Sequence, residues 1–148
     1  MNILYDERVD GVLPDVDKAG LLQALHTQWP GLEVLHQQEE LKPYECDGLS
    51  AYRTTPRLGV SPRGAGTGLS GGALPLEKGV LLVMARFNQI LHIDPAARTA
   101  RVQPGVRNLA ISQAAAPYGL YYAPDPSSQI ACSIGGNVAE NAGGVHCL

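Results

Sequence analysis

The sequence has little charge, no long apolar run and no export signal, and each of these shortages excludes a class of protein. Charged residues make up 17% of the 148 residues and the formal net charge is -3, so no cationic surface favours a nucleic-acid partner. The longest strongly apolar run covers only residues 79–85, whereas a bilayer span needs roughly 20 residues, so membrane insertion is not expected. The first residues include early acids and lack a signal-peptide pattern, so export is not indicated.

Cysteine is also scarce. Cys46, Cys132 and Cys147 are scattered and show no Cys-x-x-Cys spacing, which favours a reduced, cytoplasmic protein over a disulfide framework. His146 precedes Cys147, but adjacent side chains rarely converge on one ion, so no metal site is predicted. With 45% hydrophobic residues, the chain is long enough to form one globular domain.

Local patterns in the first third of the chain predict one helix and little else. Leucines recur at near-helical spacing over residues 15–29, where Asp15 or Asp17 can cap the helix and Pro30 ends it. Residues 47–52 predict a turn or a short capped helix.

The remainder of the chain predicts an α+β fold. The run at residues 79–85 is typical of a strand, and residues 90–93 and 99–103 predict a strand pair joined by an Asp94-Pro95 turn. A helix is then expected over residues 106–116. The following residues are expected on one face of that helix: Val106, Leu109, Ala110 and Ala114.

Residues 62–72 (PRGAGTGLSGG) hold five glycines in eleven positions, which excludes a regular backbone. Successive N–H groups in such a turn can form a concave anion site. Thr67 and Ser70 add hydroxyl donors, and Arg63 either adds positive charge or is a solvated surface residue. The alternative is a long surface loop without a ligand.

Within this loop, residues 66–71 match the dinucleotide pattern G-x-G-x-x-G, but the match is interpreted as accidental. A Rossmann unit needs a helix that opens at the glycines, whereas here a further glycine, a proline and a strand-like run follow. A P-loop is excluded because no Gly-Lys-Ser/Thr follows.

A second glycine-rich segment covers residues 133–144 (SIGGNVAENAGG). Asn137 and Asn141 are four residues apart, so they are expected to share one helical face. Each amide can donate and accept hydrogen bonds, which suits a flavin ring edge or a ribityl chain. Capping and turn formation are the alternative roles of these asparagines.

These segments resemble the PCMH-type FAD-binding domain of the FAD-linked oxidase family that contains vanillyl-alcohol oxidase, D-lactate dehydrogenases and glycolate oxidase. The resemblance rests on residues 62–71, 124–127 (PDPS), 133–137 and 141–144, in this order. Within the family, the chain is most similar to the flavin-dependent 2-hydroxyacid dehydrogenases of the glycolate oxidase D-subunit type. This likeness also covers residues 44–53 and 102–109, and so nearly the whole chain.

The resemblance implies that the first segment holds the FAD diphosphate and the second lines the ribityl chain and isoalloxazine. The diphosphate residues would be Arg63, Gly64, Ala65, Gly66, Thr67, Gly68, Leu69, Ser70 and Gly71. The flavin residues would be Pro124, Asp125, Ser127, Ser133, Ile134, Gly135, Gly136, Asn137, Asn141 and Gly143. Because no histidine lies in the first segment, the resemblance implies non-covalent FAD.

The sequence departs from this family between the nucleotide-domain segments. The family places a strand, a helix and a strand before the glycine loop, but here only residues 57–61 connect Pro56 to it, and a βαβ unit needs roughly 30 residues. We therefore expect residues 1–55 to form an amino-terminal helical or extended extension, and residues 56–148 an FAD-binding domain with an incomplete first βαβ lobe. Weak FAD retention or aggregation is expected from the exposed apolar surface.

The resemblance implies the FAD-binding portion of a glycolate or D-lactate dehydrogenase. The substrate domain is expected beyond Leu148, so this chain alone is not expected to oxidise substrate, and its catalytic residues are unknown. His146 is interpreted as a structural or flavin-edge residue.

The resemblance also implies partner subunits, one of a second flavin type and one with iron-sulfur clusters. It implies a cytoplasmic protein, which could lie peripherally at the inner membrane through those partners. Two alternatives stay open: a non-catalytic remnant or subunit-interaction module that no longer holds FAD, and a module that binds another nucleotide such as ATP or NAD.

Overall fold

The structure is a computed structural model that describes residues 17–44, 60–74 and 80–147. The chain divides into two compact units, Met1–Leu35 and His36–Leu148. The turn expected over residues 47–52 and most of the short connection at 57–61 lie outside the described residues. The predicted domain boundary after residue 55 also lies there, so it stays a prediction.

Helix α1 (Lys18–Gln28) is the described element of the first unit. It begins after Asp17, whose side chain accepts a hydrogen bond from the Gly20 backbone N–H at 2.9 Å. Leu21, Leu22 and Leu25 are half-buried along one side. The predicted helix is therefore confirmed, with Asp17 as its cap.

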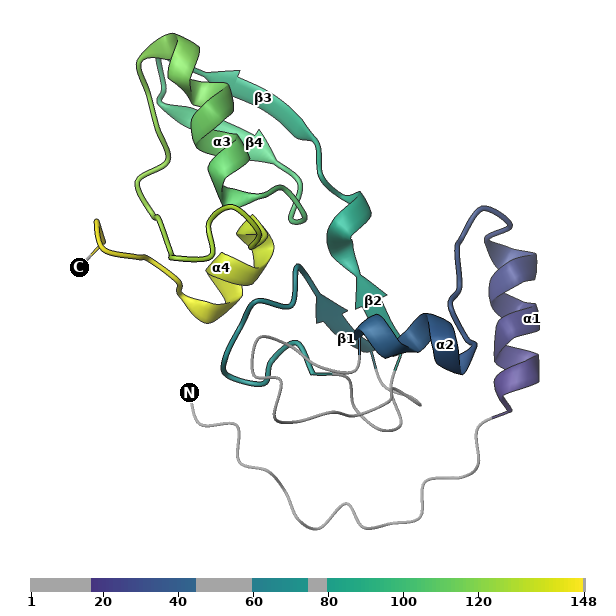
Figure 1. The fold of residues 1–148 in the computed structure, drawn as a ribbon. Helices are drawn as coiled ribbons and strands as arrows, with labels where there is room; N and C mark the ends of the chain where they lie inside the picture. The colour runs from purple at the N-terminus through teal and green to yellow at the C-terminus, as the bar shows by residue number, and fades with distance from the viewer. Residues whose placement is uncertain (1–16, 45–59, 75–79, 148) are drawn as a thin grey trace. The chain divides into compact units, whose positions relative to one another are not determined.

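The second unit begins with α2 (Gln38–Leu41) and the 3-10 turn η1 (Lys42–Tyr44), after which β1 (Val60–Arg63) pairs in parallel with β2 (Val80–Val83). A 3-10 turn, η2 (Met84–Arg86), follows β2 and leads into the next strand (Figure 1). The strand predicted over residues 79–85 is confirmed for its first part.

Strand β1 corrects the expectation that the irregular backbone begins at Pro62. Pro62 and Arg63 lie inside β1, and the irregular loop begins at Gly64. Proline is tolerated in β1 because, among the described residues, β1 pairs with β2 alone. Along its other edge no neighbouring strand needs a backbone N–H from β1.

The predicted strand pair is confirmed as an antiparallel hairpin of β3 (Ile90–Asp94) and β4 (Thr99–Val102). The Asp94 carboxylate accepts a hydrogen bond from the Ala97 backbone N–H at 3.0 Å, as expected for an aspartate that starts a turn. Arg98 takes a left-handed φ of 54° to close the turn.

Helix α3 (Asn108–Ala115) confirms the helix predicted over residues 106–116. The turn η3 (Ala116–Tyr118) and Gly119, with a φ of 69°, end it. Of the residues expected on one face, Val106 precedes the helix and is buried. The buried residues of α3 are Asn108, Ile111 and Ala115, whereas Leu109, Ala110 and Ala114 are half-buried.

Helix α4 (Ile134–Glu140) is joined to the segment that leads into α3. The Ile134 N–H donates to the Val106 carbonyl at 2.8 Å, and the Gly135 N–H donates to the Pro104 carbonyl at 2.9 Å. Figure 1 shows α3 in green and α4 in yellow adjoining at this junction. Among the described residues, the buried apolar core is Val106, Ile111, Ala115 and Cys132. The second glycine segment is thus anchored to the core.

This core location yields a stability prediction for Val106, which is 2% exposed. Val106→Ala removes buried methyl groups and leaves a cavity, so we expect the free energy of unfolding to fall by about 1.5–3 kcal/mol. Urea unfolding followed by circular dichroism measures it. Val138→Ala makes the same chemical change at a side chain that is 73% exposed, and should leave the unfolding midpoint nearly unchanged. Equal losses in both variants would place the core elsewhere.

Candidate cofactor site

The two glycine-rich segments meet at one open hollow of about 280 Å³. The loop after β1 forms one wall, and the turn before α4 together with α4 forms the other. The lining residues are Pro62, Gly64, Ala65, Gly66, Thr67, Gly68, Leu69, Gly72, Ala73, Ser128, Cys132, Ser133, Gly136, Asn137, Ala139, Glu140 and Ala142. Segments about 60 residues apart in the sequence therefore share one surface, as the sequence interpretation required.

Glycines allow the loop to approach α4 closely at both ends of the hollow. A Cβ added at Gly64 would overlap the Ser133 hydroxyl, and a Cβ added at Gly72 would lie 2.7 Å from the Glu140 carboxylate. A side chain at Gly64 would push the loop away from α4, whereas one at Gly72 would meet the flexible, exposed end of Glu140. Gly64 therefore sets the width of the hollow beside Ser133.

The walls of the hollow hold hydrogen-bond donors for which the described residues supply no acceptor. No described residue accepts a hydrogen bond from the backbone amides of residues 64–69. On the opposite wall, Ser133 and Asn137 are 5% and 7% exposed, and within the described part of the chain the Ser133 Oγ and the Asn137 Nδ2 lack a partner. Buried donors without partners are costly, so this arrangement fits a ligand rich in acceptor oxygens, such as a diphosphate.

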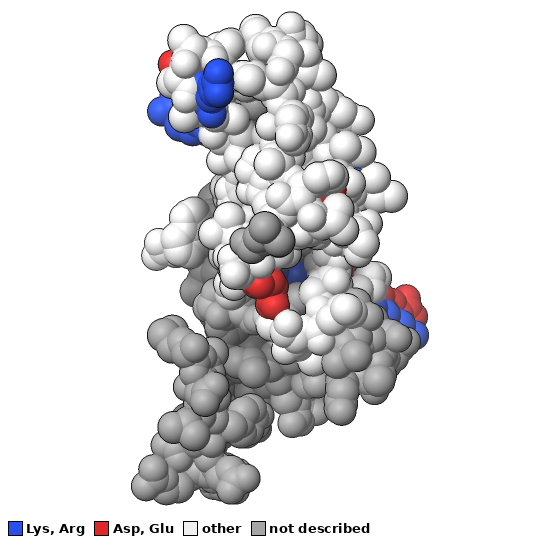
Figure 2. Space-filling view, turned by 90° about the vertical axis from the view of Figure 1, so that its left-hand side faces the viewer, with Lys and Arg blue, Asp and Glu red and all other residues white. Residues whose placement is uncertain are grey.

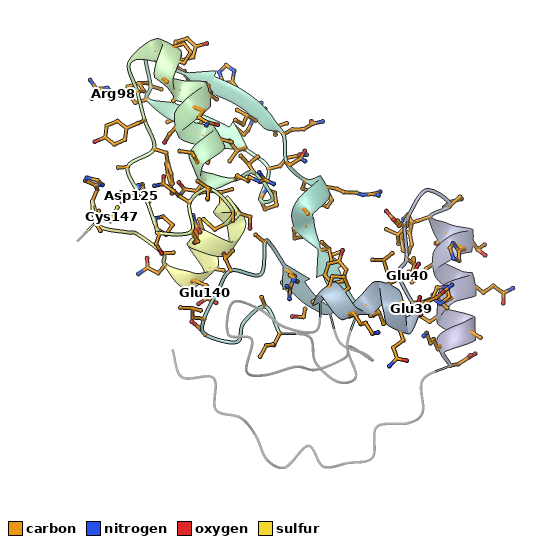
Figure 3. All side chains as sticks on the ribbon, viewed as in Figure 1. Glu39, Glu40, Arg98, Asp125, Glu140 and Cys147 are labelled. Atoms are coloured by element: carbon orange, nitrogen blue, oxygen red, sulfur yellow. The ribbon has the colours of Figure 1, made fainter. Side chains whose placement is uncertain are left out.

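Glu140 places a carboxylate on one side of the hollow, near Gly68 and Gly72. It lies at the end of α4, and Figure 3 shows its side chain beside the glycine loop. Its carboxylate is next to Gly72 and about 4.0 Å from a Cβ placed at Gly68. Figure 2 shows an acidic group near the middle of the face that it draws, a basic cluster at the upper left and charged groups of both signs at the right edge. An anionic ligand group is therefore favoured toward Gly64 and away from Glu140.

The structure brings about half of the predicted cofactor residues to the hollow. Those that line it are Gly64, Ala65, Gly66, Thr67, Gly68, Leu69, Ser133, Gly136 and Asn137. Those that do not are Arg63, Ser70, Gly71, Pro124, Asp125, Ser127, Ile134, Gly135, Asn141 and Gly143. Their contact with a cofactor stays a prediction.

Several of the second group have structural contacts instead. Gly135 packs so closely on Pro104 that an added Cβ would lie 2.8 Å from the proline Cβ. Pro124 is held through its carbonyl, which accepts a hydrogen bond from the buried Asn108 side chain at 2.9 Å. Arg63 is 7% exposed, which contradicts the alternative of a solvated surface residue.

The expectation that Asn137 and Asn141 share a helical face is wrong. Helix α4 ends at Glu140, and Asn141 is its C-cap in the left-handed region, with φ 54° and ψ 43°. Asparagine tolerates this conformation better than most residues. As the cap, Asn141 lies beyond the last helical residue and does not continue the face that carries Asn137. Asn137 is buried while Asn141 is exposed, so the cap role of Asn141 corresponds to the alternative interpretation.

The sequence interpretation did not include several lining residues. Glu140 and Cys132 lie within or next to the second glycine segment, so their spacing from Asn137 and Ser133 was the available signal. The other unanticipated lining residues are Pro62, Gly72, Ala73, Ser128, Ala139 and Ala142. Most of these are small, and small residues carry little signal when read one at a time.

A clamp joins the turn at Asp125 to the end of the second glycine segment. The Asp125 Oδ2 lies 2.6 Å from the His146 Nδ1, and the Asp125 Oδ1 accepts the His146 backbone N–H at 3.2 Å. The Asp125 N–H donates to the Gly143 carbonyl at 2.8 Å. His146 is therefore a structural partner of this turn. Figure 3 shows Asp125 and Cys147 near each other at this clamp.

The clamp lowers the pKa of Asp125, and its main chain packs against Gly144. The side-chain hydrogen bond from His146 lowers the pKa of Asp125 below its ordinary value of 3.8, with a further contribution from the His146 backbone N–H. Gly144 has a φ of 81° and packs on the Asp125 main chain, so only glycine fits there.

Within the described residues, no helix is long and apolar enough to cross a membrane. No group of three or more histidine, cysteine or acidic residues gathers as a metal site in the same part of the chain.

The fold and hollow define an α+β domain with a glycine-lined ligand site. Residues 49–148 match the family described as FAD binding domain, so the chain belongs to this FAD-binding domain family. FAD is accordingly the cofactor that this family and the site indicate. The donor-rich, glycine-lined hollow fits the diphosphate of such a cofactor.

The chain is similar to named proteins of this family. It is 68% identical to the glycolate oxidase subunit GlcD of Escherichia coli (strain K12) over 170 aligned positions, which include all of this chain and 34% of GlcD. It is 40% identical to the D-lactate dehydrogenase of Anaerostipes hadrus over 62% of this chain and 19% of that protein. A solved structure of alkyldihydroxyacetonephosphate synthase matches 71% of this chain and 19% of that chain, with 25% identity and a TM-score of 0.50.

The chain thus spans about a third of the length of GlcD. Because the alignment has 170 positions and the chain 148 residues, 22 positions of GlcD have no counterpart in this chain. This chain therefore lacks positions that GlcD has, and their location at the short connection before the glycine loop stays a prediction. The described residues contain a parallel two-stranded sheet at this point and so confirm the α+β fold class.

The hydrogen bonds between Asp125 and His146 predict how the stability of the fold depends on pH. Since its pKa is lowered in the folded state, Asp125 contributes stability above its ordinary pKa of 3.8, and this contribution is lost as the pH falls through the folded value. His146→Ala removes the side-chain hydrogen bond and keeps the backbone one, so it should raise the Asp125 pKa toward its ordinary value of 3.8. Carbon-13 NMR of the aspartate carboxyls measures it. Asp94, whose carboxylate accepts from the Ala97 backbone N–H, is the internal control. An unchanged Asp125 titration in H146A would refute the assigned cause.

Proposed function

We propose that this chain is the FAD-binding part of a flavin-dependent 2-hydroxyacid dehydrogenase that acts on glycolate or D-lactate. The observation that carries the proposal is the hollow that the glycine loop shares with Ser133 and Asn137, where among the described residues the amides of residues 64–69 have no protein acceptor. The similarity to GlcD and to a D-lactate dehydrogenase supports the substrate class.

The geometry suggests how the chain would hold FAD. The diphosphate would accept hydrogen bonds from the amides of residues 64–67, at the end of the hollow far from Glu140. A volume of about 280 Å³ is at the lower limit for ligand pockets, so the hollow would take the diphosphate and its neighbourhood rather than the entire cofactor. Ser133 and Asn137 would donate to it from the other wall.

Binding would be non-covalent, because residues 62–72 contain no histidine that could attach a flavin. When bound, FAD would supply the redox chemistry, while the residues of this chain bind and orient it. The clamp at Asp125 and His146 would fix the turn at residues 124–127 relative to the second glycine segment.

The wider setting follows from GlcD, whose name calls it a subunit of glycolate oxidase. We propose partner subunits of a second flavin type and of an iron-sulfur type, a cytoplasmic location, and a separate substrate-binding domain that completes the enzyme. The hydroxyacid would then be oxidised only in the larger assembly.

The alternative is a non-catalytic remnant or subunit-interaction module that no longer holds FAD. Two observations favour it: the 22 positions missing relative to GlcD, and the exposure of Val80 and Leu82 on the two-stranded sheet, at 37% and 43%. We propose that the missing positions fall at residues 57–61, where they would have covered this sheet.

Flavin content separates the two functions. The chain is purified in the presence of FAD, desalted, and its flavin absorbance is compared with its protein concentration. A stoichiometric yellow cofactor supports the FAD-binding function, whereas a colourless protein that fails to bind added FAD supports the remnant. A dye-reduction assay with glycolate and D-lactate on the flavin-loaded chain then tests whether activity needs further domains.

The width of the hollow yields a mutational prediction. Gly64→Ala places a methyl group on Ser133, and overpacking of about 1–3 kcal/mol should weaken FAD binding roughly 5-fold to 150-fold. Fluorescence titration of FAD measures the affinity. Gly31→Ala is the control, because an added Cβ at Gly31 meets nothing within 4 Å. Wild-type affinity in G64A, with folding unchanged by circular dichroism, would show that FAD does not use this hollow.

A further inference from the structure

Arg63 is a buried cation at the point where β1 ends and the glycine loop begins. It is the last residue of β1, and only 7% of it is exposed. Burial of a guanidinium costs free energy unless its N–H groups have acceptors. Specific contacts must therefore offset the cost of burying Arg63. Arg63 is not among the residues that line the hollow.

The guanidinium links the two ends of the loop. Its Nη1 donates to the Ala73 carbonyl at 3.1 Å, and Ala73 lies ten residues further along the chain. The same nitrogen is 3.4 Å from the Tyr44 carbonyl, and the Arg63 Cζ lies 5.8 Å from the centre of the Tyr44 ring. One side chain thus connects β1, the far end of the loop and η1.

The middle of the loop packs against the Arg63 guanidinium. Gly66 has a φ of 70°, and a Cβ added there would overlap the Arg63 Nη2 and lie 2.7 Å from its Cζ. The backbone at Gly66 therefore packs directly on the guanidinium plane. Arg63 contacts the loop at its start, its middle and its end.

We propose that Arg63 is a positioning residue, which holds the glycine loop in its binding conformation from behind and does not bind the phosphates. The proposal rests on the proposed function for its effect on FAD, but the loop contacts exist without the cofactor. The guanidinium orients the amides of residues 64–69 by fixing Gly66 and Ala73. A lysine cannot reproduce this, because one ammonium lacks the planar surface on which Gly66 rests.

The test compares Arg63→Lys and Arg63→Met with Arg101→Met, an exposed arginine of β4, as the matched control. Nitrogen-15 NMR relaxation of the cofactor-free chain measures the backbone order parameters of residues 64–73. FAD titrations at low and high salt measure affinity and its salt dependence, and the absorption band of bound FAD reports its environment.

We expect lower order parameters across the loop in R63M, and FAD binding weaker by about tenfold to hundredfold, the range for lost charge-assisted hydrogen bonds. R63K should recover part of the affinity. The salt dependence should match that of the wild type, because screening weakens a direct ion pair with phosphate and does not affect a contact behind the loop. R101M should behave as wild type.

Two results would overturn the proposal. Unchanged loop order parameters in R63M would show that the guanidinium does not hold the loop. A flattened salt dependence in R63M would make Arg63 a phosphate ligand. If the wild-type chain binds no FAD, the proposed function fails, but the order parameters of the cofactor-free chain still decide whether Arg63 holds the loop. Should R63M fail to fold, R63K supplies the same comparison.

Discussion

The site depends on the close approach of an irregular loop to the start of α4. Gly64 lies against Ser133, so at this point the loop approaches α4 as closely as glycine permits. The loop, Ser133 and Asn137 line one hollow, and within the described residues the loop amides, the Ser133 Oγ and the Asn137 Nδ2 lack a protein partner. The unpaired donors cost stability in the free chain, and an acceptor-rich cofactor would offset that cost when it binds.

Each wall is held by a different part of the second unit. The loop is joined at its start, middle and end to the buried Arg63, whereas α4 is joined through Ile134 and Gly135 to the segment before α3 and through Cys132 to the core. Neither wall includes the β3–β4 hairpin among its lining residues. The apolar core is therefore concentrated behind the second wall, and the first wall depends on polar contacts.

The sequence predicted the regular elements and the convergence of the two segments, because glycine clusters and apolar periodicity are strong local signals. It left the role of Asn141 open between a helical face shared with Asn137 and a cap, because only the backbone conformation at Asn141 decides between them. It left Arg63 open between a charged loop residue and a solvated one, because its contacts with Ala73 and Gly66 come from the fold. Glu140 was overlooked although it lies three residues after Asn137, because its nearness to Gly72 depends on how the loop meets α4.

The central claim is that both segments bind one FAD molecule. Hydrogen exchange of the full chain with and without FAD tests it most directly. If the claim is right, FAD protects residues 64–69 and residues 133–137 together, and leaves the β3–β4 hairpin unchanged. Protection confined to one segment, or centred on the hairpin, would contradict it.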